Sequence, residues 1–154
     1  MNYNSLLMRE TTGYSLKKHG TDMKIIIADD SKLIRDRITE RVELIDNVNI
    51  VAQTTNSFET IEEINKHKPD VLLLDIRMPE GSGINVLKYI QKKKKKIITV
   101  VVTNYPIMQY KNKCFELGAD YFFSKASEFD EVFKLVEKLA KKRRGEKEIK
   151  KWRN

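Results

Sequence analysis

Two short apolar segments that are each followed by aspartate constrain the fold of this 154-residue chain most. Residues 24–28 (KIIIA) precede Asp29 and Asp30, and residues 71–74 (VLLL) precede Asp75. Because the apolar residues do not alternate with polar ones, both segments are typical of strands buried on both faces of a parallel sheet. The carboxyl ends of parallel strands meet at one edge of the sheet, so we expect the three carboxylates to lie together there.

Three neighbouring carboxylates predict a metal site. Negative charges in close contact repel one another, and each loses hydration when it is buried, unless a cation neutralises them. Carboxylate oxygens are ligands that Mg²⁺ prefers in proteins. We therefore expect Asp29, Asp30 and Asp75 to share a Mg²⁺ ion.

From Met23 onward, strand and helix patterns alternate. Further strands are expected at residues 49–53, 97–102 and 121–124. Helices are expected at about residues 31–44, 84–91 and 106–117, and from a capping Ser127 onward. Another helix is expected after Asn56 and Ser57, either of which can cap it. Parallel strands require crossover connections, so the pattern predicts an α/β fold with a doubly wound five-stranded parallel sheet, flavodoxin-like strand order 2-1-3-4-5 and helices on both faces.

Helical periodicity also predicts which side chains face the core. In the first helix, Leu33 lies on the apolar face with four other aliphatic residues. In the second helix, Phe58, Ile61 and Ile64 are expected to point inward. Gly118 is placed to end the fourth helix in a left-handed conformation.

The chain divides into three parts. Residues 1–22 show no sustained period and are expected to be a disordered extension, residues 23–141 form the domain, and residues 142–154 form a basic tail. No apolar stretch approaches the roughly 18 residues of a membrane span and no signal peptide is evident, so we expect a cytoplasmic protein. A single cysteine and two distant histidines argue against an internal disulfide, zinc or haem.

The formal net charge of +8 is concentrated near the carboxyl end. Residues 141–154 contain eight cations and two glutamates. Such a segment can bind the phosphates of nucleic acid or an anionic membrane, but the sequence favours a solvated end that aids solubility. The lysines of residues 92–96 are interpreted in the same way, as a solvated loop.

Polar residues at the ends of four predicted strands indicate phosphoryl chemistry. Thr103 and Lys125 are expected to join the aspartates at the carboxyl edge of the sheet. A carboxylate such as that of Asp75 can attack a phosphoryl group in line and form an aspartyl phosphate, provided that the charge on the equatorial oxygens is neutralised. A bound Mg²⁺, the lysine ammonium and the threonine hydroxyl are suited to that neutralisation.

These residues belong to longer motifs. The motifs are Ala28-Asp29-Asp30-Ser31, residues 72–79 (LLLDIRMP) with Gly81 and Gly83, residues 101–103 (VVT) and residues 118–125 (GADYFFSK). Over about residues 23–141 the chain resembles the receiver domain of bacterial two-component response regulators.

The resemblance implies a role for each acidic residue. A sensor histidine kinase or a phosphotransfer protein would pass its phosphoryl group to Asp75. Mg²⁺ would be bound by Asp30, Asp75 and the backbone carbonyl of Arg77, with Asp29 in the same acidic pocket. The domain would not be an enzyme, because it would catalyse only its own phosphorylation and dephosphorylation.

The same resemblance implies a switch. Thr103 and Lys125 would contact the phosphoryl oxygens, and movement of the threonine would vacate space that Phe122 fills by turning inward. The change would alter the surface of the fourth helix, fifth strand and fifth helix and thereby the contact with a downstream protein.

Two residues depart from the usual pattern of the family, Ala126 and Asn104, the second of which is bulkier than the small residue usually found next to the threonine. Ala126 follows Lys125 where most receivers have proline, so we expect a trans peptide bond. Arg77 and Tyr105 flank the phosphorylation site, two residues beyond Asp75 and Thr103. They could impede the attacking water, and we therefore expect slow autodephosphorylation.

Alternative functions remain open at this point. Because about 13 residues follow the predicted domain, the first hypothesis is a stand-alone receiver that signals through protein contacts. An alternative is a nucleic-acid-binding protein in which the receiver controls the basic tail, although the sequence favours this less. A third hypothesis, an aspartate-dependent phosphatase, is disfavoured because such enzymes usually have a second aspartate where this chain has Arg77. A flavodoxin-like FMN carrier is also disfavoured, because Asp29 and Asp30 would repel the phosphate of FMN.

Overall fold

The computed structural model describes residues 22–153, which contain one parallel sheet of five strands. The strands are β1 (Met23–Ala28), β2 (Val48–Thr54), β3 (Val71–Leu74), β4 (Ile98–Thr103) and β5 (Tyr121–Ser124). Their order is β2-β1-β3-β4-β5 and all pairs are parallel, which confirms the predicted topology. The predicted disordered extension lies outside the described residues, apart from its last residue, Asp22.

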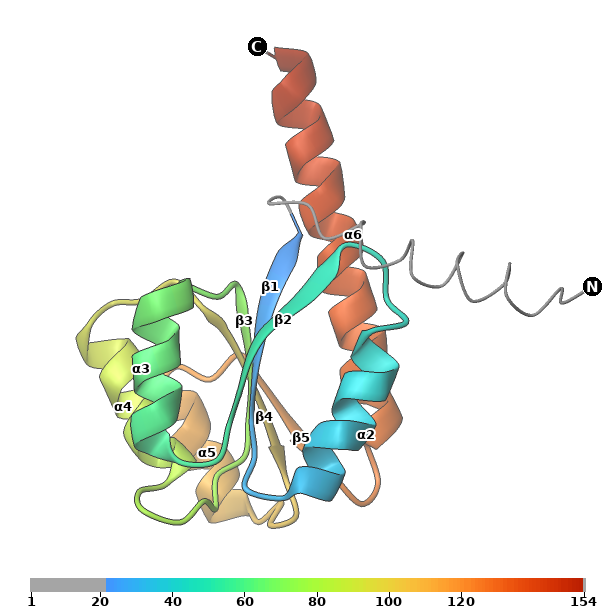
Figure 1. Ribbon diagram of the computed structural model, residues 1–154. Coiled ribbons are helices and arrows are strands. Elements are labelled where there is room, and N and C mark those ends of the chain that lie inside the picture. The colour runs from blue at the N-terminus through green and yellow to red at the C-terminus, as the bar shows by residue number, and fades with distance from the viewer. Residues whose placement is uncertain (1–21, 154) are drawn as a thin grey trace, which may run out of the picture.

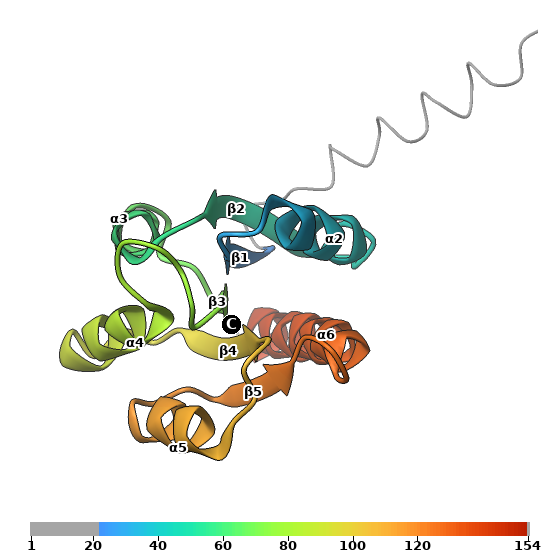
Figure 2. The same ribbon diagram turned by 90° about the horizontal axis from the view of Figure 1, so that it is seen from below.

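Five helices cover the two faces of the sheet. They are α2 (Lys32–Val42), α3 (Ser57–His67), α4 (Gly83–Lys92), α5 (Met108–Glu116) and α6 (Phe129–Arg153). Figure 2 shows α2 and α6 on one face and α3, α4 and α5 on the other. No helix among the described residues is both long enough and apolar enough to cross a membrane.

The apolar strands fill a core on each side of the sheet. In β1, Ile25 and Ile27 pack with the side chains of α2 and α6, whereas Ile26 and Ala28 point into the core beneath α3, α4 and α5. All four residues of β3 are buried. Burial on both faces is the physical reason why these strands lack polar alternation.

Local signals set several helix ends, and those at Asn56 and Gly118 agree with the sequence prediction. The Asn56 side chain accepts a hydrogen bond of 2.9 Å from the Glu59 backbone N–H and so caps α3. Ser31 caps α2 in the same way, accepting from Ile34 N–H at 3.3 Å. Gly118, after α5, has a φ of 91°, which glycine adopts without a steric penalty.

Two predicted core residues are instead exposed. Leu33 is 68% exposed, because α2 faces the core through Ile38 and Val42. Phe58 is 71% exposed, because Ser57, Thr60 and Ile64 form the buried face of α3. The Thr60 hydroxyl shares a buried hydrogen bond of 2.7 Å with Thr54, which fixes the rotation of α3 and turns the aromatic ring to solvent.

The last helix differs most from the sequence prediction. It begins at Phe129 rather than at Ser127, and it continues to Arg153 through the segment predicted as a tail (Figure 1). The ion pair between Arg143 and Asp70, with an N–O distance of 2.7 Å, holds the helix where it passes the sheet. No proline interrupts the segment.

Candidate functional site

The carboxyl edge of the sheet brings the predicted site residues to one end of the domain. Asp29 and Asp30 follow β1, Asp75 follows β3, Thr103 ends β4 and Lys125 follows β5. Backbone hydrogen bonds extend the sheet into these positions. The Asp75 N–H donates to Ala28 O at 2.9 Å, and the Lys125 N–H donates to Thr103 O at 2.8 Å.

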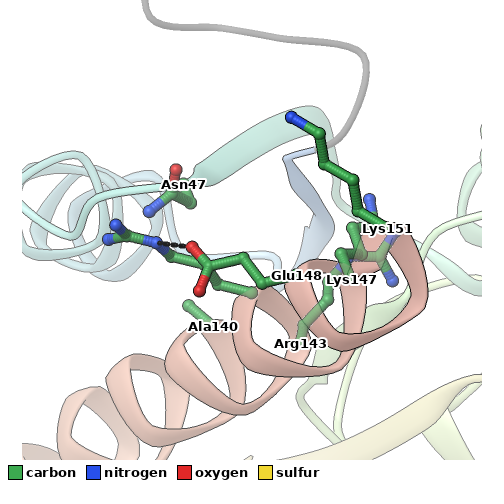
Figure 3. A pocket seen from close by; sticks show the side chains of 7 residues that line it. Asn47, Ala140, Arg143, Lys147, Glu148 and Lys151 are labelled. Carbon is green, nitrogen blue, oxygen red and sulfur yellow. Dashed lines mark hydrogen bonds and ion pairs between the residues drawn. The ribbon is translucent and has the colours of Figure 1, made fainter. Parts of the chain in front are cut away.

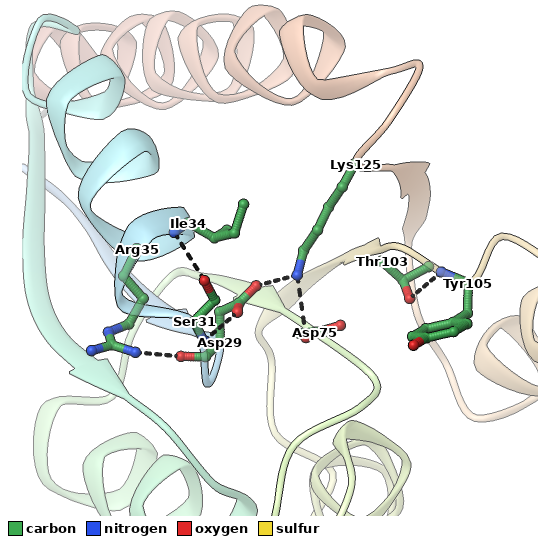
Figure 4. A network of polar contacts seen from close by, with 8 residues as sticks. All are labelled: Asp29, Ser31, Ile34, Arg35, Asp75, Thr103, Tyr105 and Lys125. Atoms are coloured by element: carbon green, nitrogen blue, oxygen red, sulfur yellow. Dashed lines mark hydrogen bonds and ion pairs between the residues drawn. The ribbon is translucent and has the colours of Figure 1, made fainter.

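The three predicted acids form a cluster. One oxygen from each of Asp29, Asp30 and Asp75 lies within 4.8 Å of the other two. Asp29 and Asp75 are buried, and Asp30 is exposed. The Asp29 carboxylate accepts a hydrogen bond of 2.9 Å from the Ser31 backbone N–H. The backbone carbonyl of Asp29 accepts another, of 2.8 Å, from the Arg35 guanidinium (Figure 4).

Lys125 bridges two of these acids. Its Nζ lies 2.5 Å from Asp29 Oδ2 and 3.2 Å from Asp75 Oδ2, as Figure 4 shows. The lysine side chain is only 6% exposed. A cation in so dry a position partly neutralises two carboxylates, since little water screens the attraction.

Burial raises the pKa of Asp75 to about 6 from an ordinary value of 3.8. Lys125 lowers this pKa, while the charges of Asp29 and Asp30 raise it. Desolvation is the largest of these effects, so the single lysine does not compensate for the burial of the carboxylate.

The donor set fits Mg²⁺. Three carboxylates at one sheet edge offer only hard oxygen ligands, and two of them remain buried with one lysine between them. A second positive charge would lower the repulsion that raises the pKa of Asp75. Asp29, Asp30 and Asp75 are therefore the residues suited to hold the ion.

Thr103 is completely buried at the end of β4. Its hydroxyl oxygen accepts a hydrogen bond of 3.0 Å from the Tyr105 backbone N–H. Because the bond uses the oxygen as acceptor, the hydroxyl proton can still be donated to another group. Figure 4 shows the threonine on the far side of Asp75 from Asp29.

Phe122 is 8% exposed and points into the core beneath α5. Its ring centroid lies 6.4 Å from that of Phe115, with the rings tilted by 50°. The structure therefore has this aromatic ring in the inward orientation.

Two glycines allow the loop after Asp75 to approach the site closely. A Cβ on Gly83 would lie 2.2 Å from the Asp75 carbonyl oxygen, which is far below any real contact. Gly81 has a φ of 100°, and a Cβ there would lie 2.1 Å from Ser57 Oγ. A side chain at Gly83 would push the loop away from Asp75, and one at Gly81 would strain the backbone and displace the Ser57 hydroxyl.

Arg77 and Tyr105 stack beside the cluster. The Arg77 guanidinium carbon lies 3.8 Å from the centre of the Tyr105 ring, so the β3–α4 and β4–α5 loops are in contact. The sequence predicted that both residues flank the site, but it did not predict that they stack. Each lies two residues beyond the end of its strand, and this equal spacing is the one feature of the sequence that could have suggested a contact between them. Among the described residues no peptide bond is cis, so the bond between Lys125 and Ala126 is trans, as predicted.

The fold and this edge together define a doubly wound α/β protein with an acidic pocket and a buried lysine at the carboxyl ends of its strands. Comparison with known protein families identifies the family to which this chain belongs. The model of the response regulator receiver domain matches residues 25–137, and the chain belongs to this family.

Individual relatives agree with this assignment. A protein-glutamate methylesterase/protein-glutamine glutaminase of Clostridium acetobutylicum is 33% identical over 122 residues, which are 78% of this chain and 35% of that protein. The chain likewise spans 61% of the transcriptional regulatory protein YvfU of Bacillus subtilis and 51% of the sensory transduction protein LytT of Bacillus anthracis. Relatives of this kind are thus longer than the matched region.

Solved structures show the same fold. A LuxR-family DNA-binding response regulator from Staphylococcus aureus has a TM-score of 0.71 and 28% identity, over 77% of this chain and 98% of that one. The receiver domain of NarL from Mycobacterium tuberculosis has a TM-score of 0.72 and 27% identity, over 78% and 97% of the two chains.

Proposed function

We propose that the protein accepts a phosphoryl group on Asp75 from a sensor histidine kinase or a phosphotransfer protein, and that it signals through altered protein contacts. The observation that carries this proposal is the buried Asp75 carboxylate beside two further acids and the Lys125 ammonium, at the carboxyl edge of a receiver fold. The proposed activity is confined to the protein's own phosphorylation and dephosphorylation.

The chemistry follows from the residue types. A carboxylate oxygen of Asp75 attacks the phosphorus in line, and the donor imidazole nitrogen leaves with the bonding electron pair. Mg²⁺, held by Asp30, Asp75 and the carbonyl of Arg77, would neutralise charge on the transferred oxygens. Lys125 already contacts the attacking carboxylate and needs only a small movement to pair with a phosphoryl oxygen.

The proposed switch uses Thr103 and Phe122. Donation of the threonine hydroxyl proton to a phosphoryl oxygen would draw the side chain toward Asp75 and weaken its bond to Tyr105. Phe122 already points inward without a phosphoryl group, so in this proposal the opened space stabilises that orientation rather than producing it. The affected surface of α5, β5 and α6 includes the exposed apolar residues Phe115 and Tyr121, which a downstream protein could cover.

The stack of Arg77 on Tyr105 supports a slow autodephosphorylation. Arg77 and Tyr105 follow Asp75 and Thr103 by two residues, and the contact of 3.8 Å joins their two loops. A water molecule would have to pass a stacked pair rather than two independent side chains.

A cytoplasmic location and a receiver that acts alone remain predictions of the sequence. Because these relatives are longer than the region that matches this chain, experiment has to decide whether the receiver acts alone. The intact mass of the protein isolated from its native host tests whether further domains are attached.

Labelling by acetyl phosphate tests the proposed acceptor. We expect one Mg²⁺-dependent phosphoryl group per chain, and we expect beryllofluoride to occupy the same site. Asp75→Asn should lose the label, while Asp36→Asn, a change of an exposed acid on α2, should retain it. If Asp75→Asn were still labelled, Asp75 would not be the phosphoryl acceptor.

A further inference from the structure

The basic segment at the end of the described chain is helical and forms the carboxyl-terminal half of α6. Residues 141–153, here called the α6 extension, continue the helix past the amino edge of the sheet, at the opposite end from the acidic cluster (Figure 1). Arg143 anchors it through its ion pair with Asp70, whose other oxygen accepts from the Lys24 N–H at 2.8 Å. The extension is therefore ordered before any partner arrives, so binding needs little further ordering of the chain.

The charge of the α6 extension is strongly positive and partly uncompensated. It contains eight cations and two glutamates. Arg144 pairs with Glu148 and Lys141 pairs with Glu137, which supports the helix. Among the described residues, four exposed cations of the extension form no ion pair: Lys142, Lys150, Lys151 and Arg153.

These four cations spread over one half of the helix circumference, from Lys142 through Arg153 and Lys150 to Lys151. Successive residues of an α-helix turn by about 100°, so Lys142 and Lys151, nine residues apart, point in opposite directions. The two exposed apolar residues, Ile149 and Trp152, share one face, but Lys142 lies on that face as well. A helix that lies in a membrane surface needs a wide apolar face, and that of the α6 extension is limited to these two residues, with Lys141 and Lys142 on its two sides.

A hollow of about 210 Å³ lies at the base of the extension, between the helix and Asn47, which precedes β2. Figure 3 shows the side chains that line it. The cations among them, which include Lys147 and Lys151, all belong to the extension, and Glu148 lies with them. A polyanion that ran along the helix would therefore meet cations of the extension down to its base.

We propose that the α6 extension binds B-form duplex DNA through its phosphates, with the helix in the major groove. A helix with its side chains is about 10–12 Å across and the major groove is about 12 Å wide, with phosphates on both walls. Cations on opposite sides of a helix match those two walls. The binding is independent of base sequence, because lysine and arginine contacts to phosphates carry no sequence information.

Fluorescence titration measures this binding directly. Trp152 is the only tryptophan of the chain and is 88% exposed at the end of the extension. We titrate the full chain with a random-sequence duplex of about two helical turns, at several salt concentrations. With four unpaired cations, the plot of log K against log salt should have a slope of about −3.5, and the tryptophan emission should change on binding.

Matched variants separate the extension from general positive charge. The triple change Lys150→Gln, Lys151→Gln and Arg153→Gln should reduce the slope to about −1 and weaken binding strongly. The triple change Lys92→Gln, Lys93→Gln and Lys96→Gln removes the same charge from the exposed end of α4 and the loop after it, and it should leave the slope nearly unchanged. Equal effects of the two variants would overturn the proposal.

A charge-neutral variant tests the helix itself. Gly145→Pro keeps every cation but removes the hydrogen bond to the Lys141 carbonyl and breaks the extension. Gly145→Ala, where an added Cβ has no atom within 4 Å, is its control. Duplex binding should fall in the proline variant alone. Unchanged binding there, or binding to anionic lipid vesicles with a blue-shifted emission and none to the duplex, would refute the groove model.

Discussion

The substitution Asp75→Asn should stabilise the metal-free protein, and more so at higher pH. The pKa of Asp75 is about 6 in the folded chain and 3.8 is its ordinary value. A carboxyl with a raised folded-state pKa gives a stability that is complete below the unfolded pKa and is lost as pH rises through the folded pKa. The wild type should therefore lose stability between about pH 4 and pH 6.

The magnitude follows from these two pKa values. The ionised carboxylate costs the folded state about 1 kcal/mol at pH 4.5 and about 3 kcal/mol at pH 7.5. Asparagine removes this cost, and Lys125 keeps its contact of 2.5 Å with Asp29. At pH 7.5 the higher free energy of unfolding of Asp75→Asn should raise its unfolding midpoint temperature by about 5 °C or more relative to the wild type.

Urea unfolding with a chelator at several pH values measures the difference. Asp36→Asn, which removes an exposed acid paired with Lys32, should change stability by less than about 0.5 kcal/mol at every pH. Excess Mg²⁺ should narrow the gap between Asp75→Asn and the wild type, because the ion stabilises only the chain that binds it. A variant that is less stable than the wild type at pH 7.5, or an advantage independent of pH, would refute the reasoning.

Three further outcomes are expected from the site and the core. Gly83→Ala should cost about 1–3 kcal/mol of stability and reduce labelling, because its Cβ would lie 2.2 Å from the Asp75 carbonyl oxygen; denaturation beside Gly145→Ala measures this. Arg77→Ala and Tyr105→Ala should each shorten the lifetime of the phosphorylated protein several-fold, and an unchanged decay of the label would contradict the role of the stack. Burial raises the pKa of Cys114 to about 11 from 9.0, so its thiol should react about 100-fold more slowly with a disulfide reagent at pH 8 than in the urea-unfolded chain, and equal rates would show that it is accessible.

Local sequence patterns predicted the sheet and the acidic site. The apolar segments before Asp29 and Asp75 identify buried parallel strands, and parallel strands place the residues at their carboxyl ends along one edge. The cluster within 4.8 Å confirms that expectation. Strand order and both helical layers followed from the same alternation, since crossovers leave few other arrangements.

Local sequence patterns did not predict the contacts between residues that are distant in the chain. The rotation of α3, which exposes Phe58, depends on the buried hydrogen bond between Thr54 and Thr60, and helical periodicity does not reveal it. The lysine that bridges Asp29 and Asp75 was expected at the same edge, but its pairing and the raised pKa of Asp75 depend on burial.

The two ends of the domain show the division between sequence and tertiary structure. At the acidic end, the sequence by itself determined which residues meet, because strand polarity fixes the edge at which each side chain emerges. At the basic end, the sequence gives the order of the positive charges, but their arrangement on a continuous helix depends on the tertiary structure. Arg143 meets Asp70 across 73 positions of sequence, and only the folded sheet brings that carboxylate to the helix that it anchors.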